Sequence, residues 1–120
     1  MRQVLGEDFT FVPHLLPIQR GILVTVYARL AKKMERSSLL SLYQEFYQGE
    51  PFVQLLPEGS FPQIRSVQHS NFCQIGVHVD STGTQAIIVG VIDNLGKGAS
   101  GQAVQNMNIM FQWEETRGLI

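Results

Sequence analysis

Residues 73–92 have the sequence CQIGVHVDSTGTQAIIVGVI, which predicts a β-hairpin. From Cys73 to Val79 the apolar side chains recur at every second position, a period typical of a strand with one buried face. A turn-forming sequence at residues 81–83 leads into a second apolar run at residues 86–92. We therefore expect two antiparallel strands here, with the other segments of the chain packed around them.

Further strands are predicted in the segments before the hairpin. Residues 20–30 alternate between two sets of side chains, one of them clearly apolar, which predicts a long strand. Residues 8–12 are mainly aromatic and β-branched and stop at Pro13, which suits the end of another strand. Residues 52–56 form a brief apolar run between two prolines, and a last strand is predicted around residues 64–68.

Two helices are predicted from apolar residues at helical spacing. The first covers about residues 38–48, with Ser37 and Ser38 as N-cap candidates and Gly49 after its end. The second covers about residues 99–111. One side of this second helix is predicted to carry its apolar residues: Ala103, Val104, Met107, Met110 and Phe111. Mainly antiparallel strands packed by two helices make an α+β domain.

The composition is that of one globular domain with few charges. At 120 residues, 44% hydrophobic, the chain is long enough for one core, so residues 1–120 are expected to form a single domain. The net charge is −1 and no basic run exceeds Lys32-Lys33, so nucleic acid is not an expected partner. Neither a span of roughly 20 apolar residues nor a signal peptide is present, so no membrane is expected. Cys73 is the single cysteine, which excludes an intramolecular disulfide and favours a cytoplasmic location.

The sequence GKGASG at residues 96–101 matches the G-x-G-x-x-G pattern of dinucleotide-binding proteins. A Rossmann fold also needs a second parallel strand that ends in an acidic residue about 20 residues later, for which too little sequence follows. A free-standing dinucleotide fold is therefore not expected. A glycine-rich start of a helix still predicts backbone N–H groups that could face an anion or a carboxamide.

Cys73 is expected to be a core residue, and the three histidines are expected to be surface or structural residues. Cys73 lies on the apolar side of a predicted strand, where a free cysteine usually behaves as a small hydrophobic residue. His14, His69 and His78 lack the spacing of metal ligands, so no metal site is expected. His14 lies between two prolines in a loop that also carries Arg20, a place where polar groups can be held rigidly.

Three segments together resemble N-acetyl-gamma-glutamyl-phosphate reductase, an NADP-dependent family of arginine biosynthesis. They are residues 9–23 (FTFVPHLLPIQRGIL), 70–75 (SNFCQI) and 92–108 (IDNLGKGASGQAVQNMN). The family carries F-T-P-H-L-x-P-M-x-R-G-I-L, G-S-N-F-C-D-I and I-D-N-L-V-K-G-A-A-G-Q-A-V-Q-N-M-N in the same order. Four positions depart from the usual residue: Val12 replaces Thr, His69 replaces Gly, Gln74 replaces Asp and Gly96 replaces Val.

The resemblance implies that the chain is the C-terminal, substrate-side and dimerisation portion of a two-domain oxidoreductase, without the N-terminal Rossmann domain. Its fold would be like the C-terminal domain of glyceraldehyde-3-phosphate dehydrogenase-type enzymes. In the family a thiolate attacks the acyl phosphate and a histidine manages protons. The family's S-N-P-G-C and H-x-H-x-P-E motifs do not occur here. No catalytic residue is therefore assigned, and the isolated chain is expected to be inactive.

The resemblance also assigns site residues. The nicotinamide side of the NADP site would be lined by four residues: Asn94, Lys97, Gly98 and Gln102. His14 and Arg20 would contact the substrate, N-acetyl-gamma-glutamyl phosphate, because a guanidinium suits carboxylate or phosphate oxygens. Partners would be the Rossmann domain and a second copy of the chain. Met107, Met110 and Phe111 would pack partly against the Rossmann domain in the intact enzyme, and in the chain alone they would be covered by self-association or by helix repacking. The alternative is a stand-alone, non-catalytic binding or assembly module derived from that enzyme.

Overall fold

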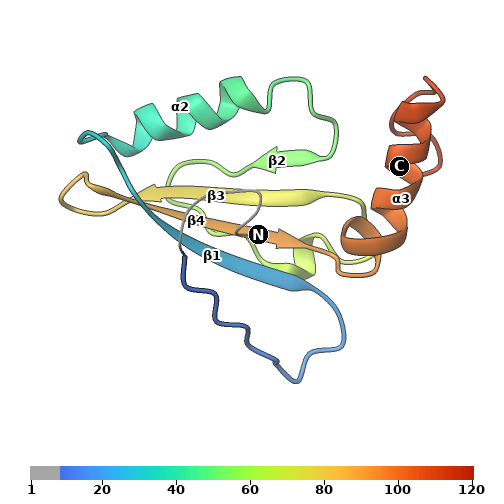
Figure 1. Cartoon of the computed structure of the whole chain (residues 1–120), viewed down its shortest axis with the longest axis horizontal. Helices are drawn as coiled ribbons and strands as arrows, with labels where there is room; N and C mark the ends of the chain where they lie inside the picture. The colour runs from blue at the N-terminus through green and yellow to red at the C-terminus, as the bar shows by residue number, and fades with distance from the viewer. Residues whose placement is uncertain (1–8) are drawn as a thin grey trace.

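The computed structural model describes residues 9–120, which contain one four-stranded sheet in the order β1-β4-β3-β2. The strands are β1 (Ile22–Arg29), β2 (Val53–Leu55), β3 (Cys73–Val79) and β4 (Gln85–Ile92). β4 pairs antiparallel with both β1 and β3, whereas β2 runs parallel to β3 at the other edge (Figure 1). The predicted α+β class is confirmed, with a sheet that is mixed.

The predicted hairpin forms the centre of this sheet. β3 and β4 pair in a register that sets Val77 opposite Ile88. Asp80 stabilises the turn, because its Oδ1 accepts hydrogen bonds of 2.9 Å from the backbone N–H groups of Thr84 and Gln85. The strand predicted over residues 20–30 is also confirmed, as β1.

One face of the sheet is partly covered by the helix α2 (Arg36–Phe46). Its Leu39 is 6% exposed and packs with Val77 and Ala86 of the hairpin. Burying one leucine side chain contributes roughly 1.5–3 kcal/mol to stability. Figure 1 shows α2 lying along β2 and β3, so β1 receives little cover from it.

The predicted helix is confirmed, but its predicted N-cap is wrong. Glu35 occupies the N-cap position with extended backbone, φ −82° and ψ 155°, and its side chain makes no capping hydrogen bond. Ser37 and Ser38 already lie inside the first turn, where the Ser37 carbonyl accepts a hydrogen bond from the Ser41 hydroxyl. The helix ends before Gly49, whose φ of +87° favours glycine.

The opposite face of β3 and β4 is covered by the irregular segment between β2 and β3. Phe61 stacks on the ring of His78, with centroids 4.0 Å apart, and the His78 ring hydrogen-bonds the Ser60 carbonyl oxygen. Val67 of this segment is completely buried. His78 therefore has the structural role expected for it.

The strand predicted around residues 64–68 is wrong, because this region is a 3₁₀ helix, η1 (Ile64–Ser66). Its hydrogen bonds are local: the Ser66 N–H donates to the Gln63 carbonyl and the Val67 N–H to the Ile64 carbonyl. The edge of the sheet beside β3 is taken by β2, which lies within the predicted apolar run 52–56.

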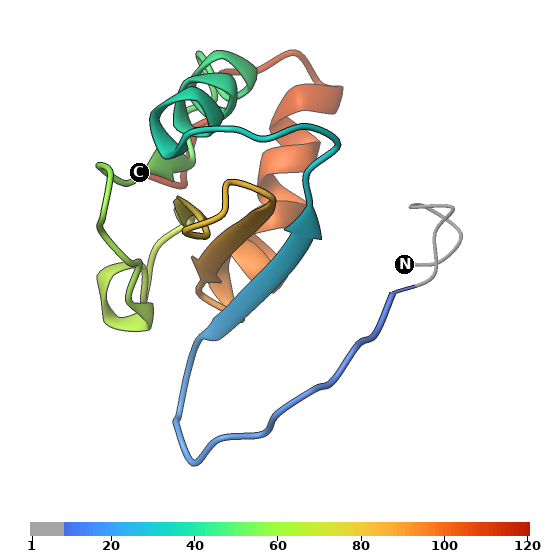
Figure 2. The ribbon, with the colours of Figure 1, turned by 90° about the vertical axis from the view of Figure 1, so that its left-hand side faces the viewer.

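The strand predicted at residues 8–12 is also wrong for its described part, residues 9–12; residue 8 lies outside the described residues. No strand of residues 9–120 pairs with this segment, and Phe11 and Val12 are 64% and 63% exposed. Figure 2 shows the segment before β1 running away from the sheet. A strand-like sequence without a pairing partner cannot satisfy its backbone as a strand.

Helical backbone begins at Gly96, three residues before the predicted start of the second helix at about residue 99. A π-helical turn, η2 (Gly96–Ser100), leads directly into α3 (Gly101–Met110). The side of α3 that carries the predicted apolar residues is mostly exposed in the chain, since Met107, Met110 and Phe111 are 41%, 79% and 62% exposed. Gln105 and Asn108 are buried instead. Among the described residues, no helix combines the length and the apolar character needed to cross a bilayer.

Candidate functional site

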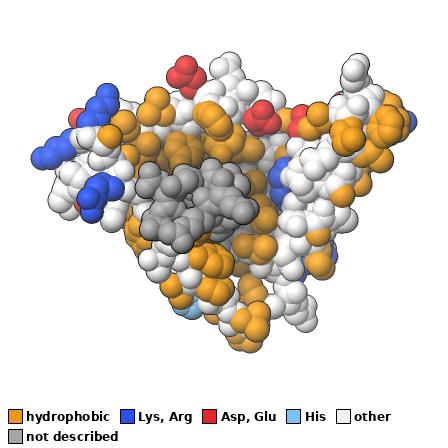
Figure 3. Space-filling model, viewed as in Figure 1, with side chains coloured by type: hydrophobic (Ala, Val, Ile, Leu, Met, Phe, Trp, Pro, Cys, Tyr) orange, Lys and Arg blue, Asp and Glu red, His pale blue; other side chains and the backbone are white. Residues whose placement is uncertain are grey.

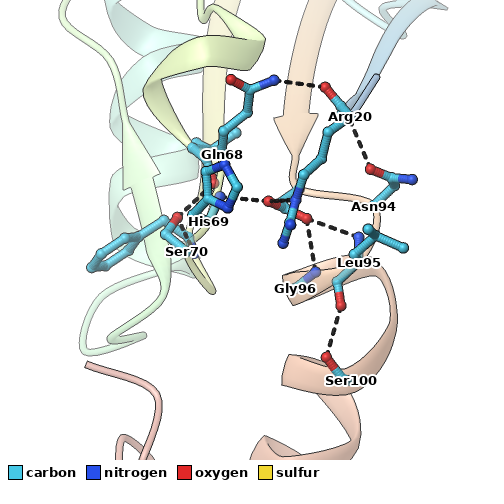
Figure 4. Close-up of polar contacts among 12 residues, drawn as sticks. Arg20, Gln68, His69, Ser70, Asn94, Leu95, Gly96 and Ser100 are labelled. Atoms are coloured by element: carbon cyan, nitrogen blue, oxygen red, sulfur yellow. Dashed lines mark hydrogen bonds and ion pairs between the residues drawn. The ribbon is translucent and has the colours of Figure 1, made fainter. Parts of the chain in front are cut away.

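A buried carboxylate joins three separate segments at the end of β4. Asp93 is 0% exposed, and its two oxygens divide the neighbouring donors between them. Oδ1 accepts hydrogen bonds of 2.8 Å from the backbone N–H groups of Leu95 and Gly96. Oδ2 accepts one of 2.6 Å from Arg20 Nε and one of 2.5 Å from the His69 backbone N–H. Figure 4 shows His69, Arg20 and the turn with Leu95 and Gly96 converging from different directions.

Asp93 carries its negative charge despite its burial. Burial by itself would raise its pKa, but the hydrogen bonds from Arg20 and the three backbone N–H groups outweigh it and hold the pKa below the usual carboxyl range. The side chain of Arg20 is 26% exposed, so the ion pair lies at the edge of the interior. A buried charge is tolerated when it is paired and hydrogen-bonded in this way.

The backbone around Arg20 is fixed by side chains from two other segments. Gln68 Nε2 donates to the Arg20 carbonyl and the Gly21 N–H donates to Asn94 Oδ1, both at 2.8 Å. Gly21 has φ +122°, and a Cβ atom there would overlap the Ile64 side chain, so glycine is required. The structure thus brings together Arg20, predicted to face the substrate, and Asn94, predicted to face the cofactor.

The glycines of the GKGASG sequence allow close packing at the start of α3. A Cβ atom on Gly96 would lie 2.5 Å from the Ser70 carbonyl oxygen, and one on Gly101 would overlap Asn71 Oδ1. The N–H groups of Leu95 and Gly96 already donate to the Asp93 carboxylate, and that of Gly98 donates to the Asp93 carbonyl. The expectation that this glycine-rich stretch offers its N–H groups to an anion or a carboxamide is therefore wrong for Gly96 and Gly98.

Lys97 points into a polar network between α3 and the C-terminal segment. Its Nζ donates a hydrogen bond of 2.6 Å to Gln105 Oε1 and lies 5.5 Å from the centre of the Phe52 ring. Gln105 Oε1 also accepts from Asn71 Nδ2, and Gln105 Nε2 donates to Glu115. Burial lowers the pKa of Lys97, an effect that its neighbours oppose: Cys73, Glu115 and Glu50. The ammonium is thus held by the protein's own side chains.

Cys73 behaves as a structural cysteine. The thiol is partly buried at the start of β3, and its pKa is raised by burial, which the nearby positive charge of Lys97 only partly opposes. A thiol with a raised pKa is protonated at neutral pH and is a poor nucleophile.

The other predicted site residues are spread over the molecule. His14 is exposed in the segment before β1, where its Nδ1 lies 3.1 Å from the Val12 carbonyl oxygen. Gly98 is exposed in η2, and Gln102 is partly buried on α3, where Nε2 donates to Asn106 Oδ1. Of the six residues, Arg20, Asn94 and Gly98 are tied by hydrogen bonds to the junction around Asp93, Gly98 only through its backbone N–H.

Asp93, the centre of that junction, was not singled out from the sequence. A usable signal was present, because an Asp directly after an apolar strand often accepts hydrogen bonds from the N–H groups two and three residues later. The Asp93 carboxylate accepts such hydrogen bonds from the N–H groups of Leu95 and Gly96.

Comparison with known proteins confirms the resemblance. The family of the semialdehyde dehydrogenase dimerisation domain matches residues 2–94. The N-acetyl-gamma-glutamyl-phosphate reductase of Geobacter metallireducens is 57% identical over 110 residues, which cover 92% of this chain and 32% of that protein. The protein of the same name from Cellvibrio japonicus is 54% identical over 116 residues, or 97% of this chain and 33% of that one. The chain thus spans about a third of the length of the curated relatives it matches.

A solved structure supports the fold. Aspartate semialdehyde dehydrogenase II from Vibrio cholerae superimposes with a TM-score of 0.65 over 81% of this chain and 29% of that one, at 21% sequence identity. At this identity the similarity concerns the fold alone.

Proposed function

Because the chain belongs to the family of semialdehyde dehydrogenase dimerisation domains, we propose that it forms the substrate-side and subunit-contact portion of an NADP-dependent N-acetyl-gamma-glutamyl-phosphate reductase. The enzyme would act in the cytoplasm, in arginine biosynthesis. The observation that carries the proposal is the 57% identity to such a reductase over 92% of the chain. The geometry of the junction around Asp93 adds support.

The substrate would meet the chain at Arg20. N-acetyl-gamma-glutamyl phosphate carries a carboxylate and an acyl phosphate, and a guanidinium binds either group with paired hydrogen bonds. Arg20 is partly exposed and anchored by Asp93, so its position is set before a ligand arrives. His14, exposed in the segment before β1, would be the second contact once that segment is covered by the rest of the enzyme.

The residues of the η2 region fit the nicotinamide end of NADP better than its pyrophosphate. Asn94 uses Oδ1 to hold Gly21, which leaves its Nδ2 for a carboxamide oxygen. Gly98 is exposed, and Gln102 follows on α3. Backbone donors for a pyrophosphate are lacking at Leu95, Gly96 and Gly98, because they are engaged by Asp93. Lys97 would bind the cofactor only after its Nζ gives up the hydrogen bond to Gln105 Oε1.

The chain also presents apolar surfaces that favour contact with a partner. On the edge strand β1, Leu23 and Tyr27 are 50% and 65% exposed on one face, and Val24 and Val26 are 46% and 45% exposed on the other. Figure 3 shows further hydrophobic side chains along the segment before β1 and at the outer end of α3. Exposed apolar edge strands are unfavourable in water. Homodimerisation, or contact with a Rossmann domain, would cover these surfaces.

The reaction itself would need groups from elsewhere in the enzyme. Attack on an acyl phosphate requires a thiolate, and Cys73 has a raised pKa. The 120 residues alone are therefore expected to bind and position rather than to catalyse.

A chimeric enzyme tests this function. The chain would replace the matching segment of the Geobacter metallireducens reductase, and oxidation of NADPH would be followed with N-acetyl-gamma-glutamyl phosphate. We expect turnover within about tenfold of the parent enzyme, a change of about 1.4 kcal/mol in barrier, and none from the 120 residues alone. A matched control carries the equivalent domain of the Vibrio cholerae aspartate semialdehyde dehydrogenase II, which shares the fold at 21% identity, and is expected to be inactive.

Two results would count against the proposal. Reproducible reduction of the acyl phosphate by the isolated chain would show that it contains the catalytic groups. A chimera that is folded and dimeric but inactive would favour the alternative, a binding or assembly module.

A further inference from the structure

The two oxygens of Asp93 have different tasks. Oδ1 holds the turn that begins η2, through Leu95 and Gly96. Oδ2 holds Arg20 and His69, which belong to two other segments. We propose that Asp93 is a positioning residue: through Oδ2 it fixes the Nε edge of Arg20, so that the Nη groups are presented to a carboxylate or phosphate oxygen of the ligand. This inference rests on the proposed function and names the device by which that site binds its anion.

Arg20 is restrained at three points. Its carbonyl accepts from Gln68, the N–H of the next residue donates to Asn94, and its Nε donates to Asp93. Within residues 9–120, Asp93 Oδ2 is the one acceptor that forms a hydrogen bond with this guanidinium. Figure 4 shows the Arg20 side chain running down from the start of β1 toward the turn that carries Leu95 and Gly96. The remaining donors of the guanidinium, on the two Nη atoms, are therefore available to a ligand.

The charge of Asp93 does not cancel that of Arg20 completely. Three backbone N–H groups, those of His69, Leu95 and Gly96, share the carboxylate with the guanidinium. Their partial positive charges take up part of the negative potential, so Arg20 keeps its attraction for an anion on its outer side. A guanidinium fixed in advance also loses less rotational freedom when the anion binds.

The loop opposite Arg20 is fixed by the same oxygen. His69 has φ +62°, a left-handed conformation that a residue other than glycine adopts rarely, and its N–H donates to Oδ2. Such a conformation persists where the surroundings hold it in place. Asp93 therefore holds Arg20 and the neighbouring loop in one arrangement.

Nuclear magnetic resonance of the ¹⁵N-labelled 120-residue chain tests the inference without any turnover. Arginine Nε–H groups give their own signals, and that of Arg20 should be protected from exchange at neutral pH because Asp93 accepts its hydrogen bond. Sodium phosphate and sodium acetate, added in separate titrations at constant ionic strength, should each be scored for saturable shifts of this signal. Binding of either anion at Arg20 supports the proposal, and the comparison tells which oxyanion is preferred.

Asp93→Asn is the decisive variant. The amide oxygen can still accept from Leu95 and Gly96, but the new NH₂ group faces the donors Arg20 Nε and His69 N–H. We expect the backbone signals of Leu95 and Gly96 to stay in place, the Arg20 Nε–H to lose its protection, and anion binding to weaken by at least about tenfold. Glu58→Gln is the matched control: it removes the carboxylate of the exposed Arg36–Glu58 pair, at 3.9 Å, and should leave binding unchanged.

Arg20→Lys covers the case in which Asp93→Asn does not fold. A lysine keeps a positive charge beside Asp93 but has no planar fork, so the fold should persist while anion binding weakens by about tenfold. The inference is overturned if either folded variant binds phosphate and acetate as tightly as the unsubstituted chain. It is also overturned if neither anion shifts the Arg20 signal in the unsubstituted chain. Since no step requires NADPH, an inactive reductase chimera would leave this result standing.

Discussion

Arg20 Nε donates a 2.6 Å hydrogen bond to Asp93 Oδ2, and this ion pair ties the start of β1 to the end of β4. Replacing Asp93 by Ala would leave Arg20 without its counter-ion and three backbone N–H groups without an acceptor. A buried donor left without an acceptor costs about 1–3 kcal/mol, so the loss of this carboxylate from three N–H groups and a partly exposed guanidinium should cost about 3–5 kcal/mol in total. We expect Asp93→Ala to lower the free energy of unfolding in urea by that amount, and Glu58→Gln, in an exposed pair, by about 0–1 kcal/mol. Equal losses of stability from the two substitutions would show that Asp93 does not stabilise the fold more than an exposed ion pair does.

The stability of the chain should fall as the pH is lowered. The pKa of Asp93 is below its usual range in the folded state, so between the folded and unfolded pKa values the unfolded chain binds more protons. The stabilisation is complete above the unfolded value, about 3.9, and is lost as the pH falls through the folded value. Asp80 acts in the same direction, because hydrogen bonds, chiefly from Thr82 and Gln85, lower its pKa to about 2.

Unfolding by urea at a series of pH values from neutral downward measures this dependence. The difference in stability between the unsubstituted chain and Asp93→Asn should shrink as the pH falls through the unfolded pKa of about 3.9, because Asp93 then takes up a proton in the unfolded chain while it is still charged in the folded one, and the asparagine of the variant cannot titrate. In the Asp80→Asn variant, the free energy of unfolding should still fall with pH by the amount that Asp93 contributes. A constant difference at all pH values would show that the Asp93 charge does not contribute.

The sheet was largely predictable because its centre follows local rules. The alternation of apolar residues from Cys73 to Val79 and the turn before β4 specify the hairpin, and both are confirmed. Residues 64–68 have a similar composition but form the 3₁₀ helix η1. These residues cannot pair with β3 because β2 already occupies the edge of the sheet beside it. That pairing joins segments far apart in the sequence, so no local pattern predicts it.

The orientation of α3 and the centre of the site were not predictable from periodicity. Asn108 Nδ2 donates to the carbonyls of Glu115 and Arg117, and Gln105 donates to Glu115. These partners lie in the C-terminal segment, so they can satisfy polar side chains on the buried side of the helix. Apolar periodicity alone therefore does not show which side of this helix is buried within the chain. Arg20 and Asn94 were found through family resemblance, whereas the carboxylate between them required the folded chain.

Gly101 should resist replacement by alanine, although alanine normally stabilises a helix. Its backbone is helical, with φ −64° and ψ −40°, but a Cβ atom would overlap Asn71 Oδ1. We expect Gly101→Ala to destabilise the chain by about 1–3 kcal/mol in thermal or urea unfolding. The cost should shrink in part in an Asn71→Ala background, where the nearest overlapping atom is gone but the Gly96 carbonyl, 2.9 Å from such a Cβ, remains. An unchanged cost in that background would mean that crowding by Asn71 is not the cause.

The apolar outer side of α3 should drive association of the isolated chain. Met110 and Phe111 are 79% and 62% exposed, and such surfaces favour burial against a second molecule. Replacing both by Gln should weaken self-association by at least about tenfold in sedimentation or light-scattering measurements. Glu45→Gln, at an exposed position on the other helix, α2, is the control. A monodisperse monomer for the unsubstituted chain, with α3 well protected from hydrogen exchange, would contradict this expectation.

In the reductase chimera, substitution of Arg20 should affect binding of substrate more than the chemical step. Arg20→Lys keeps a charge beside Asp93 but loses the paired donors, so KM for N-acetyl-gamma-glutamyl phosphate should rise about tenfold while kcat changes less than about twofold. Initial rates of NADPH oxidation over a range of substrate concentrations separate the two constants. Arg65→Lys is the matched control, because Arg65 is exposed in η1, and it should change neither constant. If Arg20→Lys lowers kcat and leaves KM unchanged, Arg20 acts on the reacting group itself, because the guanidinium would then stabilise the transition state without stabilising the bound substrate.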